Sequence, residues 1–165
     1  MNPVEWLETN IPEFVNLPEV DRQAMFHFVL LWSLFEGKTL QTSASANAIV
    51  SLVNRWNTEG RLDFKAFEND LEYFRQRYFV DGEPTHYFHG LNLRRNDSPE
   101  LVRSVLQREN NDITDCISAL IIVIYRLRNN LFHGVKWAYG IRGQLDNFTH
   151  ANDVIMKALS LANTN

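Results

Sequence analysis

Two arginines, two adjacent asparagines and a histidine lie together in one short segment, Arg126–His133. An imidazole exchanges its proton near neutral pH, and a guanidinium can hold two phosphate oxygens and stabilise charge that builds up on them. These groups suit cleavage of a phosphodiester by a neighbouring ribose 2′-hydroxyl, which needs no metal ion and restricts the substrate to RNA. The alternative is that they only cap a helix end and face solvent.

The spacing within this segment limits which side chains can meet. On a continuous helix, Arg126 and His133 share one face because they are seven residues apart. Asn129 or Asn130 lies between them on that face and can orient the histidine. Arg128 and His133 are about 140° apart around the helix. They therefore converge only if the helix breaks, if the arginine wraps round it, or if a second subunit completes the site.

Charge is unevenly distributed around this segment. The chain has a formal net charge of −4, which argues against a surface coated in basic residues for nonspecific duplex binding. Between Asp115 and Asp146, however, there is no carboxylate, and all four charged residues there are basic: Arg126, Arg128, Lys136 and Arg142. An anionic ligand would be attracted to this stretch. The same pattern also fits a core helix whose cationic end complements its dipole.

Composition and length predict one domain over residues 1–165. The apolar share is 45%, with 11 Phe and 4 Trp, which is enough for a hydrophobic core. The longest apolar run, 116–125, is about half of the roughly 20 residues that a membrane-spanning helix needs. The N-terminal residues lack the basic pattern of a targeting signal, and the single cysteine, Cys116, fits a reducing compartment. We expect a cytoplasmic protein with Cys116 buried.

Apolar periodicity and end signals predict six helices. We expect them from Pro18 to Gly37, from about residue 46 to Gly60, over 63–78, over about 99–109, over about 112–133, and over about 148–162. Residues 117–125 are rich in β-branched side chains and could form a strand, but steps of three and four favour a helix that is buried nearly all round. Residues 80–97 contain many helix breakers and are predicted to form an extended surface loop. The fold class is therefore an all-α, up-and-down bundle of about five or six helices.

Other polar residues carry weaker signals. His86 and His89 could bind a metal, but no cysteine or third ligand is positioned beside them, so no metal site and no cofactor are predicted. Arg94 and Arg95 are expected on a solvated loop, where they could also contact an RNA backbone. His27 is assigned to the core or to an interface. His150 is expected on the polar side of the last helix, and neither histidine has an evident partner.

The segment that ends at His133 resembles a motif of a known family. The stretch Arg128-Asn129-Asn130-Leu131-Phe132-His133 is similar to the R-x4-6-H motif of the HEPN superfamily, including the polar residue after the arginine and a position late in a helical domain of this size. The longer spacing from Arg126 also satisfies the motif, but the following Leu127 departs from it. Arg128 is therefore preferred as the motif arginine. Elsewhere the resemblance is architectural.

The resemblance implies a fold, an activity and partners. HEPN domains are helical bundles that commonly form homodimers, and many are metal-independent endoribonucleases in toxin–antitoxin or antiviral defence systems, with a site shared between subunits. The motif's catalytic arginine and histidine fall on Arg128 and His133, and its polar residue falls on Asn129. A polar residue from the first helix would be Glu36, although a carboxylate at a helix end can also be simply solvated.

The remaining site residues follow from position. Arg126, Asn130 and Lys136 are expected to help hold RNA. A nucleotidyltransferase-type antitoxin is a possible partner if cleavage is toxic, and no membrane partner is expected. The superfamily also includes inactive members, so the rival hypothesis is a non-catalytic module that binds RNA or a protein.

Overall fold

The computed structural model describes residues 2–134 and 143–163. Most of these residues are helical, and the prediction of an all-α fold is confirmed at that level. The described helices and strands are α1 (Pro3–Asn10), α2 (Pro12–Val15), α3 (Glu19–Thr39), α4 (Ala46–Thr58), α5 (Phe64–Tyr78), β1 (Phe79–Val80), β2 (Glu83–Pro84), α6 (His86–Gly90), the 3-10 helix η1 (Arg95–Asp97), α7 (Pro99–Leu106), α8 (Ile113–Phe132) and α10 (Leu145–Asn163).

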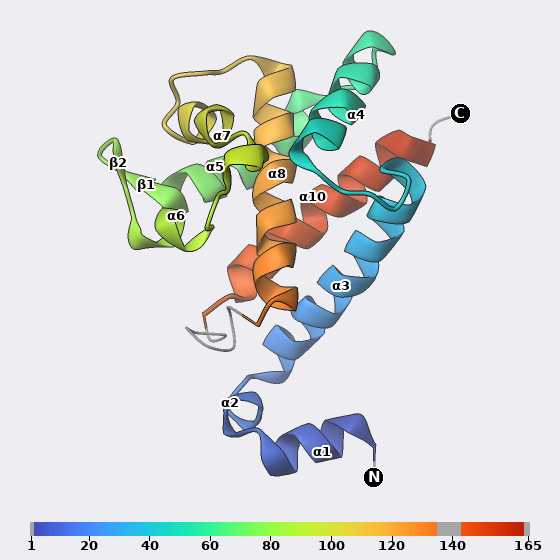
Figure 1. The fold of residues 1–165 in the computed structure, drawn as a ribbon, viewed down its shortest axis with the longest axis vertical. Helices are drawn as coiled ribbons and strands as arrows, with labels where there is room; N and C mark the ends of the chain where they lie inside the picture. The colour runs from blue at the N-terminus through green and yellow to red at the C-terminus, as the bar shows by residue number, and fades with distance from the viewer. Residues whose placement is uncertain (1, 135–142, 164–165) are drawn as a thin grey trace.

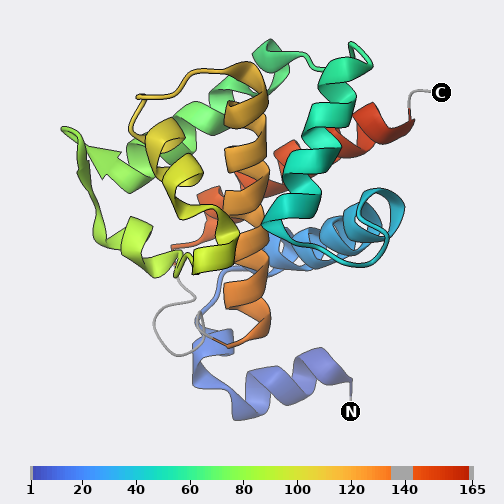
Figure 2. The ribbon, with the colours of Figure 1, turned by 45° about the horizontal axis from the view of Figure 1, so that its top comes forward.

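Helix α8 runs through the centre of the bundle (Figures 1 and 2). Its N-cap is Asp112, whose carboxylate accepts a hydrogen bond from the Asp115 amide at 3.0 Å. Every residue from Cys116 to Ile124 is buried, and helices α4, α5 and α7 pack around it. The prediction of a helix that is buried nearly all round is therefore confirmed.

Helices α3 and α10 form the most extensive helix pair in the described structure. The rings of Phe28 and Phe148 pack with centroids 5.1 Å apart, and the Asn152 amide donates a hydrogen bond to the Ala24 carbonyl at 3.0 Å. The predicted end of α3 at Gly37 is wrong, because the helix continues to Thr39. The last turn carries the buried Leu40 into the core, which offsets the cost of a glycine within the helix.

The segment 80–97 is not the extended loop that its breakers predicted. Strands β1 and β2 pair in an antiparallel hairpin whose turn, Asp81-Gly82, has positive φ at both positions, as a type I′ turn requires. Helix α6 then buries Phe88, and Leu91 follows it into the core. The helix breakers in this segment therefore form turns between short strands and helices. A few apolar side chains anchor these short elements to the bundle.

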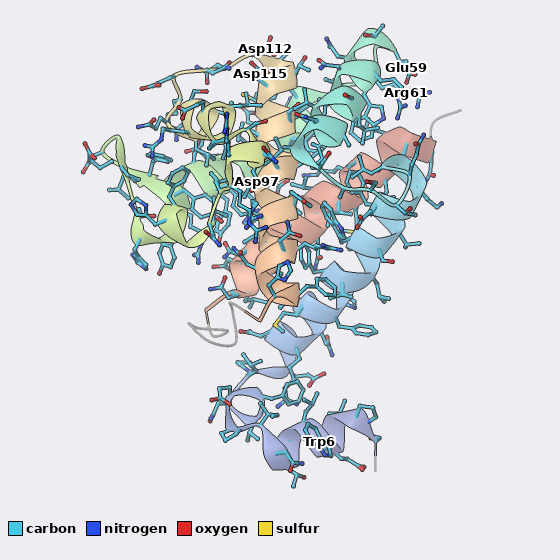
Figure 3. The ribbon with its side chains drawn as sticks, viewed as in Figure 1. Trp6, Glu59, Arg61, Asp97, Asp112 and Asp115 are labelled. Atoms are coloured by element: carbon cyan, nitrogen blue, oxygen red, sulfur yellow. The ribbon has the colours of Figure 1, made fainter. Side chains whose placement is uncertain are left out.

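Helices α1 and α2 form an arm that projects away from the bundle, as the position of Trp6 shows (Figures 1 and 3). Neither helix contains a buried residue. The guanidinium of Arg22 holds the arm: it pairs with Glu8 at 2.7 Å, donates to the Phe14 and Leu17 carbonyls at 3.1 and 3.2 Å, and lies 4.3 Å from the Phe14 ring centroid. The Arg22 side chain thus links α3 to both helices of the arm.

The described residues also limit which kinds of site the fold can hold. No helix among them is both long enough and apolar enough to cross a membrane. Within 2–134 and 143–163, no group of three or more His, Cys, Asp and Glu side chains is placed to hold a metal ion. His86 and His89 accordingly have no third ligand beside them in this part of the chain.

Candidate functional site

Helix α8 delivers the candidate motif to the edge of the bundle. It continues without a break to Phe132, and His133 is its C-cap, with the His133 amide donating to the Asn129 carbonyl at 2.9 Å. Gly134 follows with φ of +70°, a conformation that favours glycine, so the predicted helix end is confirmed. The His133 side chain is exposed. A histidine at this position can reach a ligand in solvent.

Arg126 is not at the surface. Its side chain is 3% exposed, its Nη1 lies 3.1 Å from Asp97 Oδ2, and its Nε donates to the Leu91 carbonyl at 3.2 Å (Asp97 is labelled in Figure 3). Burial lowers the pKa of the Arg126 guanidinium, and the charge of Asp97 only partly offsets this effect. Arg126 therefore ties α8 to η1 and to the end of α6.

Asn130 performs the same task one turn later. It is buried, and its side-chain amide donates to the carbonyls of Gly90 at 3.0 Å and Leu91 at 3.3 Å. The sequence placed Arg126 and Asn130 among the residues that hold RNA. Their buried contacts with η1 and with the end of α6 give both residues a role in positioning α8.

Arg128 occupies a different face of the helix and is partly exposed. Its Nη1 donates to Asn129 Oδ1 at 2.9 Å, its Nη2 lies 3.7 Å from Glu36 Oε2, and its guanidinium lies 5.0 Å from the Phe132 ring centroid. Its buried Nε has no hydrogen-bond partner among the described residues. Arg128, Asn129 and Glu36 are therefore brought together, as the resemblance implies.

Glu36 is fixed from both of its oxygens. Oε2 accepts a hydrogen bond from Trp32 Nε1 at 2.8 Å, and Oε1 accepts one from the Ala44 amide at 3.1 Å. The side chain is only 19% exposed, so it is not a freely solvated carboxylate at a helix end. Its charge partly offsets that of Arg128 and orients the guanidinium.

The described structure does not join His133 to the other motif residues by a side-chain hydrogen bond. Asn129 accepts from Arg128, and Asn130 donates to the α6 end, so neither asparagine holds the imidazole as expected. Lys136 and Arg142, two of the predicted cations, lie outside the described residues.

A hollow of about 500 Å³ opens beside the motif, and we call it the Arg94 pocket. It lies between η1, α8 and the start of α4, and its lining includes Ser45, Arg94, Arg95, Arg126 and Asn129. The sequence predicts Arg94 and Arg95 on a solvated loop, and both side chains are exposed. No local pattern could place them against α8, because their position depends on the buried contact between Arg126 and Asp97.

A second cluster of ionisable groups lies between α5 and α10 and was missed from the sequence. Asp70 is buried, and its two carboxylate oxygens lie 2.7 Å from His150 Nδ1 and 2.7 Å from Lys157 Nζ. Asp70 and His150 are far apart in the chain, so only the packing of α5 on α10 reveals the pair. The prediction that His150 has no evident partner is therefore wrong.

Comparison with family models, with curated proteins and with solved structures finds no match to this chain. Fold alone does not determine activity, since unrelated functions share common folds. The function is therefore argued from the geometry and chemistry of the sites.

Proposed function

We propose that this chain is a cytoplasmic, homodimeric endoribonuclease of the HEPN type that cleaves RNA without a metal ion. The observation that carries the proposal is the end of α8: an exposed His133 follows, on the same helix, a partly exposed Arg128 held by Asn129, Glu36 and Phe132. One group suits proton transfer and the other suits an anion. Preorganisation of the arginine supports a role in stabilising developing charge.

In the proposed reaction, His133 accepts the proton of a ribose 2′-hydroxyl. The 2′-oxygen then attacks the adjacent phosphorus, and the bond from phosphorus to the 5′-oxygen of the next nucleotide breaks. That 5′-oxygen receives a proton from an imidazolium, which leaves a 2′,3′-cyclic phosphate and a 5′-hydroxyl. Arg128 stabilises the added negative charge on the phosphate oxygens during this displacement.

A homodimer is proposed because one copy leaves Arg128 and His133 on different faces of α8. The outer face of α3 carries Phe26, Leu30 and Leu34, which are 63%, 49% and 51% exposed. Their spacing of four residues makes one apolar stripe. A second copy packed on this stripe would cover these side chains and could bring its own α8 end to the first site.

The rival proposal is a non-catalytic domain that binds RNA, and the Arg94 pocket favours it. This pocket places the exposed Arg94 and Arg95 beside Asn129, so it suits a phosphate even if no bond is cut. The resemblance also extends to toxin and antiviral-defence systems. If cleavage is toxic to the cell, a partner that neutralises it is expected, such as a nucleotidyltransferase-type protein.

The test is incubation of the purified protein with a mixed RNA pool in excess chelator. We expect cleavage products that end in a 2′,3′-cyclic phosphate, and we expect His133→Ala and Arg128→Ala each to reduce the rate about 100-fold or more. His89→Ala and Arg55→Ala are matched controls, because both side chains are exposed and lie on other helices. These controls should retain the wild-type rate.

The possible outcomes separate the two proposals. Cleavage that survives His133→Ala would exclude this site as the source of the activity. If the wild type binds RNA without cutting it, and Arg94→Ala weakens that binding, the non-catalytic proposal replaces the enzymatic one. An absence of both cleavage and binding would overturn both.

A further inference from the structure

A hollow of about 560 Å³ lies between α3, α5 and α10, apart from the α8 motif, and we call it the His150 pocket. Its polar lining includes His27, Asp70, His150, Asn152, Asp153 and Lys157. Part of the remaining lining is apolar: Val20, Ala24, Leu145 and Met156. A hollow of this size, with an apolar wall and a few convergent polar groups, is typical of a small-molecule site.

The central feature of the His150 pocket is an Asp–His pair of fixed orientation. The Asp70 carboxylate is 2% exposed and lies 2.7 Å from His150 Nδ1. Because an ionised carboxylate can only accept, Nδ1 carries the proton, and in the neutral form of the ring Nε2 keeps its lone pair. The Tyr73 ring stacks on the imidazole with centroids 4.0 Å apart, and its hydroxyl donates to Asn147 Oδ1 at 2.9 Å, which keeps the ring in place.

Lys157 completes the charge balance. Its Nζ pairs with Asp70 at 2.7 Å and with Asp153 at 2.6 Å. Burial alone would lower the pKa of Lys157, but these hydrogen bonds outweigh it and raise the pKa above its ordinary value. Leaving the two histidines out of the count, one lysine against two aspartates gives the lining a formal charge of −1.

Two acceptors of the His150 pocket have no hydrogen-bond partner among the described residues. Asn152 is 8% exposed; its Nδ2 donates to the Ala24 carbonyl at 3.0 Å, and its Oδ1 has no partner among the described residues. His150 Nε2 likewise has no protein partner in the described part of the chain. A buried acceptor without a donor is costly, so a ligand that brings donors would be favoured.

We propose that the His150 pocket binds a small organic cation that carries N–H donors and an apolar body, such as a primary ammonium. The ammonium would donate to His150 Nε2 and lie near the Asp153 carboxylate, and the apolar body would cover Val20 and Met156, which are 56% and 48% exposed. An anion of the same shape is disfavoured by the two carboxylates of the lining, Asp70 and Asp153. This proposal is independent of RNA cleavage at α8.

The test uses three probes of similar shape: benzylammonium, benzyl alcohol and benzoate. Each is titrated into the full-length, ¹⁵N-labelled protein, and the imidazole resonances of His150 are followed by NMR. We expect saturable shifts of His150 with benzylammonium, at least tenfold weaker binding of benzyl alcohol and none of benzoate. Asp153→Asn should weaken benzylammonium binding about tenfold, which corresponds to about 1.4 kcal/mol.

The variants keep the test interpretable. Asp153 is 47% exposed, so its replacement is not expected to unfold the protein, whereas Asp70→Asn would disturb a buried pair. Glu100→Gln, an exposed carboxylate on α7, is the matched control and should bind like the wild type. Equal binding of benzoate, shifts that spare His150, or an Asp153→Asn variant that binds like the wild type would each overturn the proposal.

Discussion

At the scale of single residues, two arginines only two positions apart have opposite environments. Arg126 is closed into an ion pair with Asp97, whereas Arg128 is partly exposed beside Glu36. The turn of the helix alone produces this difference, because residues two apart on a helix point to different sides. Contacts therefore distinguish the two motif candidates: Arg126 holds the fold, and Arg128 is the one that a ligand can reach.

Disruption of the Arg126–Asp97 pair should destabilise the protein strongly. Asp97→Asn leaves a buried guanidinium without its counter-charge, and we expect the free energy of unfolding to fall by about 3–5 kcal/mol. The double variant Asp97→Asn/Arg126→Met should lose less, because it removes the unpaired charge. Urea denaturation measures both. A single variant within about 0.5 kcal/mol of the wild type would show that the pair does not matter for stability.

Glu36 should weaken RNA binding while it orients Arg128. Glu36→Gln removes a negative charge that lies 3.7 Å from the guanidinium, so we expect affinity for single-stranded RNA to rise a few-fold at low salt. The cleavage rate should fall, because the amide holds Arg128 less firmly. Filter binding and cleavage assays measure the two effects separately, with Glu100→Gln as the control. A parallel rise of affinity and rate would contradict the orienting role.

At the scale of helices and strands, periodicity predicted the long helices but not the short elements. The six predicted helices correspond to α3, α4, α5, α7, α8 and α10. The hairpin was missed although Asp81-Gly82 is a strong turn signal, because its strands are too short to show alternation. Helices α1, α2 and α6 were missed for the same reason: too few apolar residues repeat within them.

The candidate site was predictable in part. The position of the motif at the end of α8 and the helix end at Gly134 followed from local sequence. The proximity of Glu36 to Arg128 came only from the resemblance. The Asp97 partner of Arg126 and the Asp70 partner of His150 could not be predicted, because each contact depends on how separate helices pack.

Two glycines test the role of backbone conformation at helix ends. Gly134 has φ of +70° and Gly37 lies within α3, yet a Cβ added at either glycine would meet no neighbouring group within 4 Å. Contacts with neighbouring groups therefore do not distinguish the two substitutions to alanine. The two positions differ only in their backbone conformation. We expect Gly134→Ala to reduce the free energy of unfolding by roughly 1–2 kcal/mol and Gly37→Ala to increase it by about 0.5–1 kcal/mol. Thermal denaturation checks both signs, and the same sign for both would refute this account.

At the scale of the whole molecule, two buried acids and one partly buried acid predict sensitivity to alkaline pH. Burial raises the pKa values of Cys116, Tyr73 and Tyr78. The unfolded chain releases these protons first, so the stabilisation is complete below the unfolded pKa values and falls as the pH rises through them. The loss should begin at about pH 8.5, where an unburied thiol titrates.

Urea denaturation at several pH values between about 7.5 and 10.5 tests this dependence. We expect the free energy of unfolding to fall over this range in the wild type. Tyr78→Phe should show a smaller fall above about pH 10, because it removes one group that ionises only in the unfolded chain. An unchanged slope in Tyr78→Phe would mean that Tyr78 does not contribute.

The proposed dimer predicts a response to charge on the outer face of α3. Leu30→Glu places a carboxylate within the apolar stripe of Phe26, Leu30 and Leu34, so we expect it to shift the protein to monomers and to abolish a shared site. Val80→Glu is the control, because Val80 is 56% exposed on the hairpin. Light scattering after size-exclusion chromatography gives the mass of each. A wild-type monomer at high concentration would contradict the dimer.

The burial of α8 also predicts that different parts of the chain exchange their amide hydrogens at different rates. Amide hydrogens between Cys116 and Ile124 can exchange with solvent only when the surrounding helices separate, so their exchange should report the opening of the whole bundle. The arm of α1 and α2 has no buried residue and should exchange within far shorter times. His133 therefore lies at the C-cap of a helix whose buried segment opens only together with the whole bundle.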